Sequence, residues 1–201
     1  GFENQMQAVV YDRNGANYCG RMWWMMKWLG HDAVAVLDGG LQAWEASGGA
    51  VEKGAPAALK PIASKFELKS ALREWVSTDQ LAPQVGHPNL TLIDARAAAR
   101  YRGEVEPLDP VAGHIPGALN RPFAENLGAD GFFKSPEVLR AEFEKLLAGR
   151  DPATVVHHCG SGVSTVPNIL AMEIAGLGIT RLYPGSWSEW CNTPGLPCAK
   201  G

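Results

Sequence analysis

The chain contains one sequence pattern twice, and this internal repeat limits the possible folds more than any other feature. Tryptophans and glycines recur at a constant interval of 146 positions; the matched pairs are Gly30 with Gly176, Gly39 with Gly185, and Trp44 with Trp190. At the same interval the apolar pair Val9-Val10 matches Val155-Val156. Repetition at a fixed interval indicates one structural unit built twice. We therefore expect two related units in this chain.

Each copy predicts a buried strand, a loop and a helix. In the first copy, apolar and β-branched runs predict strands at Gln7–Tyr11 and Ala33–Leu37 and a helix at Asn17–Leu29. In the second copy, the same unit is preceded by a predicted strand at Thr91–Asp94. Strands that alternate with helices predict an α/β fold with a central parallel sheet flanked by helices.

The helix that begins after Ser135 has the clearest start signal. Ser135 stands at the N-cap, Pro136 at the first helical position, and an acidic residue in the first turn. We expect this helix to run to about Ala148, and its buried face to contain Val138, Phe143 and Leu146 or Leu147.

The front half of the second unit has no counterpart in the first. By the interval of 146, the counterpart of the segment from about Leu92 to Ala148 would lie before residue 1. We therefore expect the first copy to lack its front half, which would exist as a separate piece or in a parent protein. We predict three segments: the back half of a first domain at 1–47, a linker rich in Gly, Ala and Pro at 48–65, and a second domain at 66–201.

Composition excludes several classes of function. The formal net charge of −3 gives no electrostatic basis for binding nucleic acid or an anionic membrane, and no apolar run approaches the length of a membrane span. The four cysteines are too few and too irregularly spaced for a disulfide scaffold, and no C-x-x-C pair indicates zinc. We expect no metal, no cofactor, no nucleic-acid or membrane partner, and a cytoplasmic location.

The stretch TVVHHCGSGVSTVPN places a cysteine where a nucleophile is expected. Cys159 follows a predicted buried strand and precedes a helix that Ser164 or Thr165 can cap. Gly160 and Gly162 allow the loop between them to bend sharply. Because free N–H groups and the helix dipole favour an anion there, we expect a lowered pKa for the thiol and a reactive thiolate. The alternative is a buried structural cysteine, which the glycines and hydroxyl residues beside it disfavour.

Four sequence motifs together resemble the tandem-domain rhodaneses, the thiosulfate and 3-mercaptopyruvate sulfurtransferases. They are Asp94-Ala95-Arg96 with Arg100-Tyr101-Arg102-Gly103-Glu104, Gly113-His114-Ile115-Pro116-Gly117-Ala118, Cys159-Gly160-Ser161-Gly162-Val163-Ser164, and Gly185-Ser186-Trp187-Ser188-Glu189-Trp190. The inactive copy carries Leu37-Asp38-Gly39-Gly40 and Trp44. The resemblance implies two rhodanese-like α/β domains, of which only the second is catalytic, with the site at the domain interface.

The resemblance also implies a mechanism and a set of site residues. Cys159 would take sulfur from a small anionic donor as a persulfide and pass it to cyanide, a small thiol or thioredoxin. The backbone amides of the loop would hold the anion; they belong to Gly160, Ser161, Gly162, Val163, Ser164 and Thr165. All of these residues except Ser161 are expected to bind substrate. Arg100 would bind the carboxylate or sulfonate of the donor. Ser161 would belong to a Ser–His–Asp relay whose His and Asp lie in the missing front half.

The sequence leaves the donor open between thiosulfate and 3-mercaptopyruvate. The uncharged Gly160-Ser161 pair resembles mercaptopyruvate enzymes, but those tend to carry a second arginine where this chain reads Val105-Glu106-Pro107-Leu108-Asp109. We expect Arg96 to pair with nearby acids, and Arg102 to face solvent.

Two other functions use a cysteine in a loop of this kind. A phosphatase needs an arginine at the sixth position after the cysteine, where this chain has Thr165, so that function is disfavoured. A non-enzymatic sulfur carrier or docking module that uses the same thiol remains the alternative.

Overall fold

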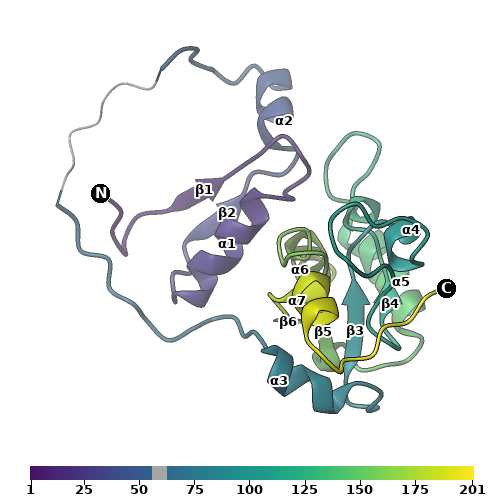
Figure 1. Ribbon diagram of the computed structural model, residues 1–201. Helices are drawn as coiled ribbons and strands as arrows, with labels where there is room; N and C mark the ends of the chain where they lie inside the picture. The colour runs from purple at the N-terminus through teal and green to yellow at the C-terminus, as the bar shows by residue number, and fades with distance from the viewer. Residues whose placement is uncertain (56–62) are drawn as a thin grey trace.

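The computed structural model describes residues 1–55 and 63–201, whose strands form two parallel sheets (Figure 1). The smaller sheet pairs β1 (Ala8–Val10) with β2 (Val34–Val36). The larger has the order β4-β3-β5-β6; its strands are β3 (Thr91–Asp94), β4 (Leu119–Asn120), β5 (Val155–His158) and β6 (Arg181–Leu182). Every pairing in both sheets is parallel. The expected α/β fold with a parallel sheet flanked by helices is confirmed.

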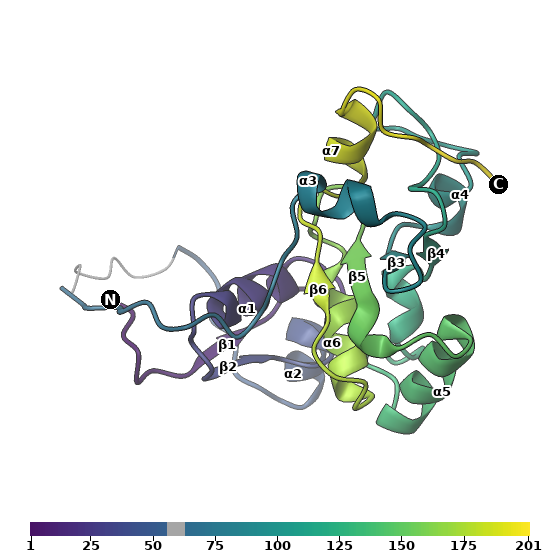
Figure 2. The ribbon, with the colours of Figure 1, turned by 90° about the horizontal axis from the view of Figure 1, so that it is seen from below.

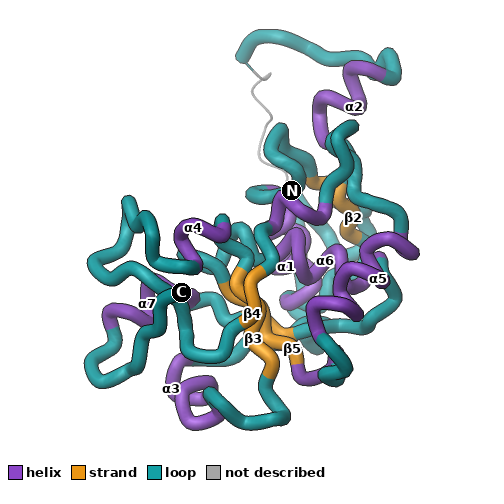
Figure 3. The backbone as a smooth tube through the Cα atoms, turned by 90° about the vertical axis from the view of Figure 1, so that its right-hand side faces the viewer, coloured by secondary structure: helices purple, strands orange, loops and turns teal. Residues whose placement is uncertain are grey.

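Helices cover both faces of the larger sheet, because neighbouring residues of a strand point to opposite faces. Leu92 and Val156 pack on the side of α3 (Thr78–Leu81) and α7 (Ser186–Asn192). On the other side, Ile93 and Val155 pack against α5 (Pro136–Leu147) and α6 (Val166–Ile174). Figure 3 shows the strands between these two groups of helices. The carboxyl ends of β3 and β5 therefore lie side by side.

Helix α5 starts where the sequence predicts, but one residue of its expected buried face is wrong. Ser135 is the N-cap, and its hydroxyl accepts a hydrogen bond from the Val138 amide. The buried residues are Leu139, Phe143 and Leu147, whereas Val138 is 45% exposed. Residues four apart lie on one face of a helix, and Val138 lies outside that stripe.

Helix α6 begins after Thr165 and carries Pro167 in its first turn, as expected. The expected cap is wrong in its chemistry. Thr165 occupies the N-cap position but has helical backbone angles, and its side chain accepts no capping hydrogen bond. A side chain normally caps from an extended backbone. The first amides of α6 are therefore not satisfied by a hydroxyl from the loop.

The first half of the chain packs on the second chiefly through helix α1 (Cys19–Trp28), and Asp38 also accepts a hydrogen bond from the Phe133 amide. The first half contains β1, α1, β2 and α2 (Gly40–Ala46). Trp23, Trp24 and Met26 of α1 share a buried cluster with Val166 and Ile169 of α6. Figure 2 shows α1 beside α6. Side chains from both halves thus form one core at their interface.

The structure corrects the alignment of the two copies at their first strand. Val10 pairs with Val36, while His157 pairs with Leu182. Since Val36 and Leu182 match at the interval of 146, Val10 corresponds to His157 rather than to Val156. The interval is therefore one residue longer at the strand and the loop. Helix α1, one residue longer than α6, absorbs the difference.

The predicted linker is only partly described. Residues 56–62 of the predicted linker at 48–65 lie outside the described residues, and the boundaries 1–47 and 66–201 remain predictions. The segment Glu67–Val76 is extended and makes a single β-bridge, between Trp75 and Leu182. The smaller elements are α4 (Ala98–Tyr101) and 3₁₀ turns at Ala82–Gln84, Phe123–Asn126 and Pro152–Thr154. In the described ranges, no helix combines the length and apolar character needed to cross a membrane.

Candidate active site

Cys159 lies at the carboxyl end of β5, and helix α7 holds its backbone. The residue is 2% exposed. Its amide donates to Ser186 Oγ at 3.1 Å, and its carbonyl accepts from the Trp187 amide at 3.0 Å. Ser186 Oγ also donates to the Tyr183 carbonyl at 3.0 Å. The first turn of α7 therefore fixes where the thiol is presented.

Sequence reasoning assigned no role to Ser186, although the repeat contains a signal for it. Ser186 has φ of 55°, and Gly40, at the matched position of the first copy, has φ of 62°. Residues other than glycine rarely adopt this region. A serine kept at such a backbone position indicates that its hydroxyl is needed there, and that hydroxyl accepts the Cys159 amide.

The loop after the cysteine presents backbone N–H groups that lack acceptors. We define the Cys159 loop as residues 159–165. From residue 160 to residue 165, no amide donates a hydrogen bond to another described residue. The Thr165 hydroxyl is also fully buried and without a partner in the described part of the chain. Buried polar groups are normally paired, so this loop is suited to receive an anion.

Gly162 shows why the loop needs glycine. Its φ is +74°, and a Cβ at this position would overlap the carbonyl oxygen of Pro184. An alanine would therefore be strained and would clash with backbone. At Gly160, by contrast, a Cβ would only touch the end of the Arg100 side chain, with Nη1 at 3.4 Å. The other loop residues lie nearer the surface: Val163 and Ser164 are half-buried, and Ser161 is exposed.

Arg100 reaches the loop, but its charge is already paired. Its guanidinium lies against Gly160 and donates to Glu106 Oε1 at 2.5 Å. Asp109 Oδ2 is 3.5 Å from the same nitrogen. Burial alone would raise the pKa of Glu106, but hydrogen bonds from Arg100 and from the amides of Leu108 and Asp109 hold that pKa below its ordinary value. Glu106 thus stays ionised at neutral pH and binds the arginine expected to bind the donor.

Arg96 is a structural residue, as expected. It is 4% exposed and donates to the Asp94 carboxylate at 2.6 Å and to the Gly113 carbonyl at 2.7 Å. Its guanidinium also stacks 4.9 Å from the ring centre of Trp187. It therefore ties β3 and the Gly113 turn to α7. Arg102 pairs with Glu104 at the surface, as expected.

Two histidines precede the cysteine in β5, and both are fully buried. Burial lowers the pKa of His157 to about 3, helped by the charges of His158 and Arg121. Burial also lowers the pKa of His158, against the attraction of Asp94. Both imidazoles are therefore neutral at pH 7 and add no positive charge next to Cys159.

The first copy fills the same loop with a carboxylate. Asp12 follows β1, and its two oxygens accept the amides of Asn14, Ala16, Tyr18 and Cys19 at 2.8 to 3.1 Å. Burial alone would raise the pKa of Asp12, but these amides hold it below its ordinary value. Burial and the Asp12 charge raise the pKa of the Cys19 thiol to about 12, so that cysteine stays protonated. The first copy is thus a loop with its anion built in.

An arginine of the first half contacts the Cys159 loop, and the sequence analysis missed it. Arg21, in α1, donates from Nη1 to the Gly162 carbonyl at 3.2 Å. It also stacks on Trp24, 5.4 Å from the ring centre. The two residues are 141 positions apart, and no pattern in the sequence links them.

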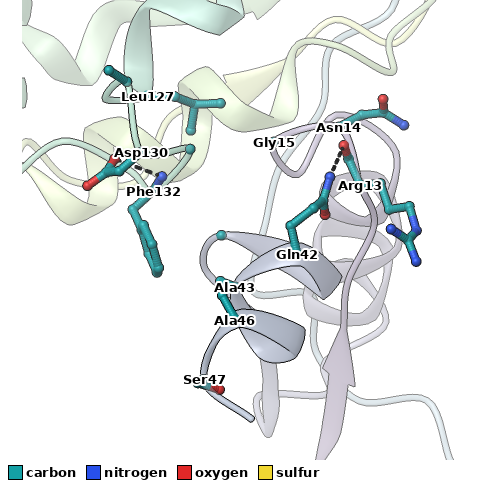
Figure 4. Close-up of a pocket in the computed structure, with 13 residues that line it drawn as sticks. Arg13, Asn14, Gly15, Gln42, Ala43, Ala46, Ser47, Leu127, Asp130 and Phe132 are labelled. Carbon is teal, nitrogen blue, oxygen red and sulfur yellow. Dashed lines mark hydrogen bonds between the residues drawn. The ribbon is translucent and has the colours of Figure 1, made fainter. Parts of the chain in front are cut away.

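A separate cavity lies at the first-copy loop. It has a volume of about 750 Å³ and lies between that loop and residues 127–132. Figure 4 shows Leu127 and Phe132 on one side and Arg13 and Gln42 on the other. Asp12 accepts four amides of the loop beside this cavity, those of Asn14, Ala16, Tyr18 and Cys19.

Known proteins match the chain along its whole length. The sequence matches the family of rhodanese-like domains over residues 2–47 and 77–193. A probable 3-mercaptopyruvate sulfurtransferase of Pseudomonas aeruginosa is 46% identical over 202 residues, which cover 100% of this chain and 70% of the relative. A putative thiosulfate sulfurtransferase of Mycobacterium tuberculosis is 38% identical over 205 residues, covering 100% and 69%.

Solved structures agree. A 3-mercaptopyruvate sulfurtransferase from Leishmania major superposes with a TM-score of 0.80 at 33% identity, over 96% of this chain and 53% of that one. SseA from Escherichia coli, also a 3-mercaptopyruvate sulfurtransferase, superposes with a TM-score of 0.77 at 31% identity, over 94% and 70%. The chain thus spans about half to two thirds of the length of these proteins.

Proposed function

The chain belongs to the rhodanese-like family of sulfurtransferases, and on that premise we propose that Cys159 carries sulfur between a donor and an acceptor as a persulfide. One observation supports this most strongly: a buried thiol precedes six loop amides and a buried hydroxyl that lack partners among the described residues. A persulfide is an anion that extends beyond the thiol, and such donors stabilise it.

The reaction is a double displacement. The Cys159 thiolate attacks the outer sulfur of thiosulfate or the thiol sulfur of 3-mercaptopyruvate, and a new S–S bond forms. The bond from that sulfur to the rest of the donor breaks, so sulfite leaves from thiosulfate, or the enolate of pyruvate leaves from 3-mercaptopyruvate and takes up the proton of the former thiol. Cyanide, a small thiol or thioredoxin then attacks the outer sulfur and releases the thiolate. The role of Ser161 in a proton relay belongs to the same proposal, and its exposed position leaves it accessible to donor.

We propose that 3-mercaptopyruvate is the preferred donor. The charged groups around Arg100 are Arg96, Asp94, Glu106 and Asp109, and with Arg100 they sum to a net negative charge. Thiosulfate carries two negative charges and 3-mercaptopyruvate one. Arg21 adds a single positive charge at the Gly162 carbonyl, so a monoanion is compensated more fully than a dianion at this site.

Mass spectrometry of the intact protein tests both proposals. After incubation with each donor separately, we expect a gain of one sulfur atom, mapped to Cys159 and absent in Cys159→Ser, which should lose at least about 10³-fold in turnover. The gain should be faster with 3-mercaptopyruvate. No gain with either donor contradicts sulfur transfer, whereas a faster gain with thiosulfate contradicts only the donor preference.

We also propose that the open face of the first half binds the front half of a rhodanese-like domain. Val9 is 54% exposed, Tyr11 54% and Trp44 45%, and they border a cavity of about 560 Å³. Trp190, the counterpart of Trp44, is fully buried in the second half. Large exposed apolar patches and free strand edges are costly in water, so a parallel strand beside β1 would cover them.

Purification of the protein from its host tests this partner. We expect the purified protein either to have a larger intact mass than these residues give or to carry a tightly associated fragment. In either case, the additional segment would be equivalent to the front part of the second half. A stable, monodisperse species of these 201 residues alone contradicts it.

We propose a reducing, cytoplasmic compartment for the protein, because all four cysteines are free thiols.

A further inference from the structure

The charges around Cys159 are unequally available to a donor. Arg96 and Arg100 are both paired with carboxylates, through Asp94, Glu106 and Asp109. A guanidinium already bound by carboxylates attracts a further anion weakly, because the incoming anion must displace or approach the bound ones. The residues expected to attract an anionic donor therefore provide little net positive charge.

Arg21 differs from these two arginines. It is half-buried, and among the described residues it makes no ion pair. Its partners are neutral: the Gly162 carbonyl and the face of Trp24. Burial lowers the pKa of Arg21, and the nearby Cys159 acts in the opposite direction. Arg21 is thus a cation beside the loop whose charge no described carboxylate neutralises.

The position of Arg21 is set from both halves of the molecule. Trp24, one turn further along α1, is 2% exposed, and the Arg21 guanidinium packs on the face of its ring. Pro184 packs on Gly162 and, together with Arg21, lines a cavity of about 220 Å³ whose other walls are Trp24, Met25, Trp28 and Trp75. The side chain therefore stands between the Cys159 loop and an apolar opening, where its charge is screened less than at an open surface.

We infer that Arg21 is the donor-recruiting residue of this site, supplied by the non-catalytic half. Its guanidinium holds the Gly162 carbonyl, which keeps the loop amides in place, and it provides the uncompensated positive charge that draws an anionic sulfur donor to Cys159. The inference rests on the proposed function for the identity of the donor. It explains what the first half contributes to the chemistry of the second.

Alkylation of Cys159 tests this charge without any sulfur transfer. Iodoacetate is an anion and iodoacetamide is neutral, and both alkylate a thiolate. In the full-length protein, we expect Arg21→Gln to lower the ratio of the iodoacetate rate to the iodoacetamide rate about fivefold, because only the anionic reagent is attracted by the lost charge. The wild-type ratio should also fall as salt is added, while the Arg21→Gln ratio changes little.

Three variants separate charge from packing. Arg21→Lys keeps the charge, so its ratio should stay within about twofold of wild type. Lys27→Gln removes a positive charge from the same helix but away from the loop, where Lys27 pairs with Asp32, and should leave the ratio unchanged. Arg21→Met retains an unbranched chain over Trp24, and replaces Arg21→Gln if the latter does not fold.

Donor kinetics complete the test. Arg21→Gln should raise the KM for the anionic donor more than it lowers kcat, because recruitment acts before chemistry. An unchanged alkylation ratio in both Arg21→Gln and Arg21→Met overturns the inference while leaving sulfur transfer intact. Conversely, a wild-type protein that forms no persulfide overturns the proposed function, and the alkylation ratio still reports on Arg21.

Discussion

The first-copy loop and the Cys159 loop differ in whether their backbone amides have an acceptor. Each follows a parallel strand and leads into a helix at the interface between the halves. In the first copy, four amides bind the Asp12 carboxylate. In the second, the amides of residues 160–165 have no acceptor among the described residues, and the buried thiol of Cys159 lies at the start of the loop. A loop that contains its own anion is a structural element, whereas one that leaves the place open is suited to bind a transient anion.

The first copy shows what the loop contributes without a nucleophile. Because the first copy has no nucleophile and still organises its amides around a negative charge, anion binding belongs to the loop itself. In the proposed function, Cys159 adds the chemistry to an anion-binding loop that does not depend on it. In the first copy, the loop that binds the Asp12 carboxylate leads directly into α1. Helix α1 in turn places Arg21 in contact with the second loop.

Removal of Asp12 should break the first loop. We expect Asp12→Ala to destabilise the protein by about 2–4 kcal/mol, since several amides, including the partly buried ones of Ala16 and Cys19, lose a charged acceptor. Cys159→Ala should cost only about 1 kcal/mol, because the second loop is already open. Chemical denaturation at pH 7 measures both, and equal losses in the two variants contradict the difference between the loops.

Gly162→Ala should distort the second loop. The positive φ and the overlap with the Pro184 carbonyl predict a loss of about 1–3 kcal/mol in stability and a fall of about tenfold or more in turnover. Gly178→Ala is the control, because Gly178 also has a positive φ, of 92°, but open space around it. It should lose about 1 kcal/mol and keep its activity. Turnover retained in Gly162→Ala would show that the loop shape is not needed.

Among the positions at which the strands that lead into the loops differ, Val10 matches His157. The folded state holds the pKa of His157 at about 3, against an ordinary value of 6.5. Between these values the unfolded chain binds a proton that the folded chain does not, so stability falls as pH falls from about 6.5, by about 1.4 kcal/mol per pH unit.

Exchange of that residue tests the effect. His157→Val places the residue of the first copy in the second strand. Denaturation between pH 6 and pH 5 should then show a slope that is shallower by about 1.4 kcal/mol per pH unit. An unchanged slope contradicts a buried neutral imidazole at this position.

Release of Arg100 should produce the smallest effect. Glu106→Gln removes the carboxylate that binds Arg100, so kcat/KM for thiosulfate should rise by about threefold to tenfold and for 3-mercaptopyruvate by less, because a dianion gains more. Glu104→Gln is the control, since Glu104 pairs with Arg102 at the surface. Steady-state assays with both donors measure the change. Equal gains for the two donors contradict the charge argument.

Local sequence predicted the elements well because their signals are local. Ser135 and Pro136 marked the start of α5, and the β-branched residues around Val155 marked β5. The position of Cys159 between a strand and a helix followed from the same signals. Errors arose where a tertiary contact decides: Val138 is exposed because packing selects one stripe of α5, and Thr165 does not cap α6 because its backbone is already helical.

The residues along the chain were enough to predict the parallel α/β units, their repetition, the proposed nucleophile Cys159 and the glycine loop that follows it. Each depends on residue types at short spacing or on one constant interval. Only the tertiary structure decided the charge at the site. Glu106 neutralises Arg100, Asp12 fills the first loop, and Arg21 reaches Gly162 from 141 positions away. Electrostatic interactions depend on distances in space, which the order of residues along the chain does not contain.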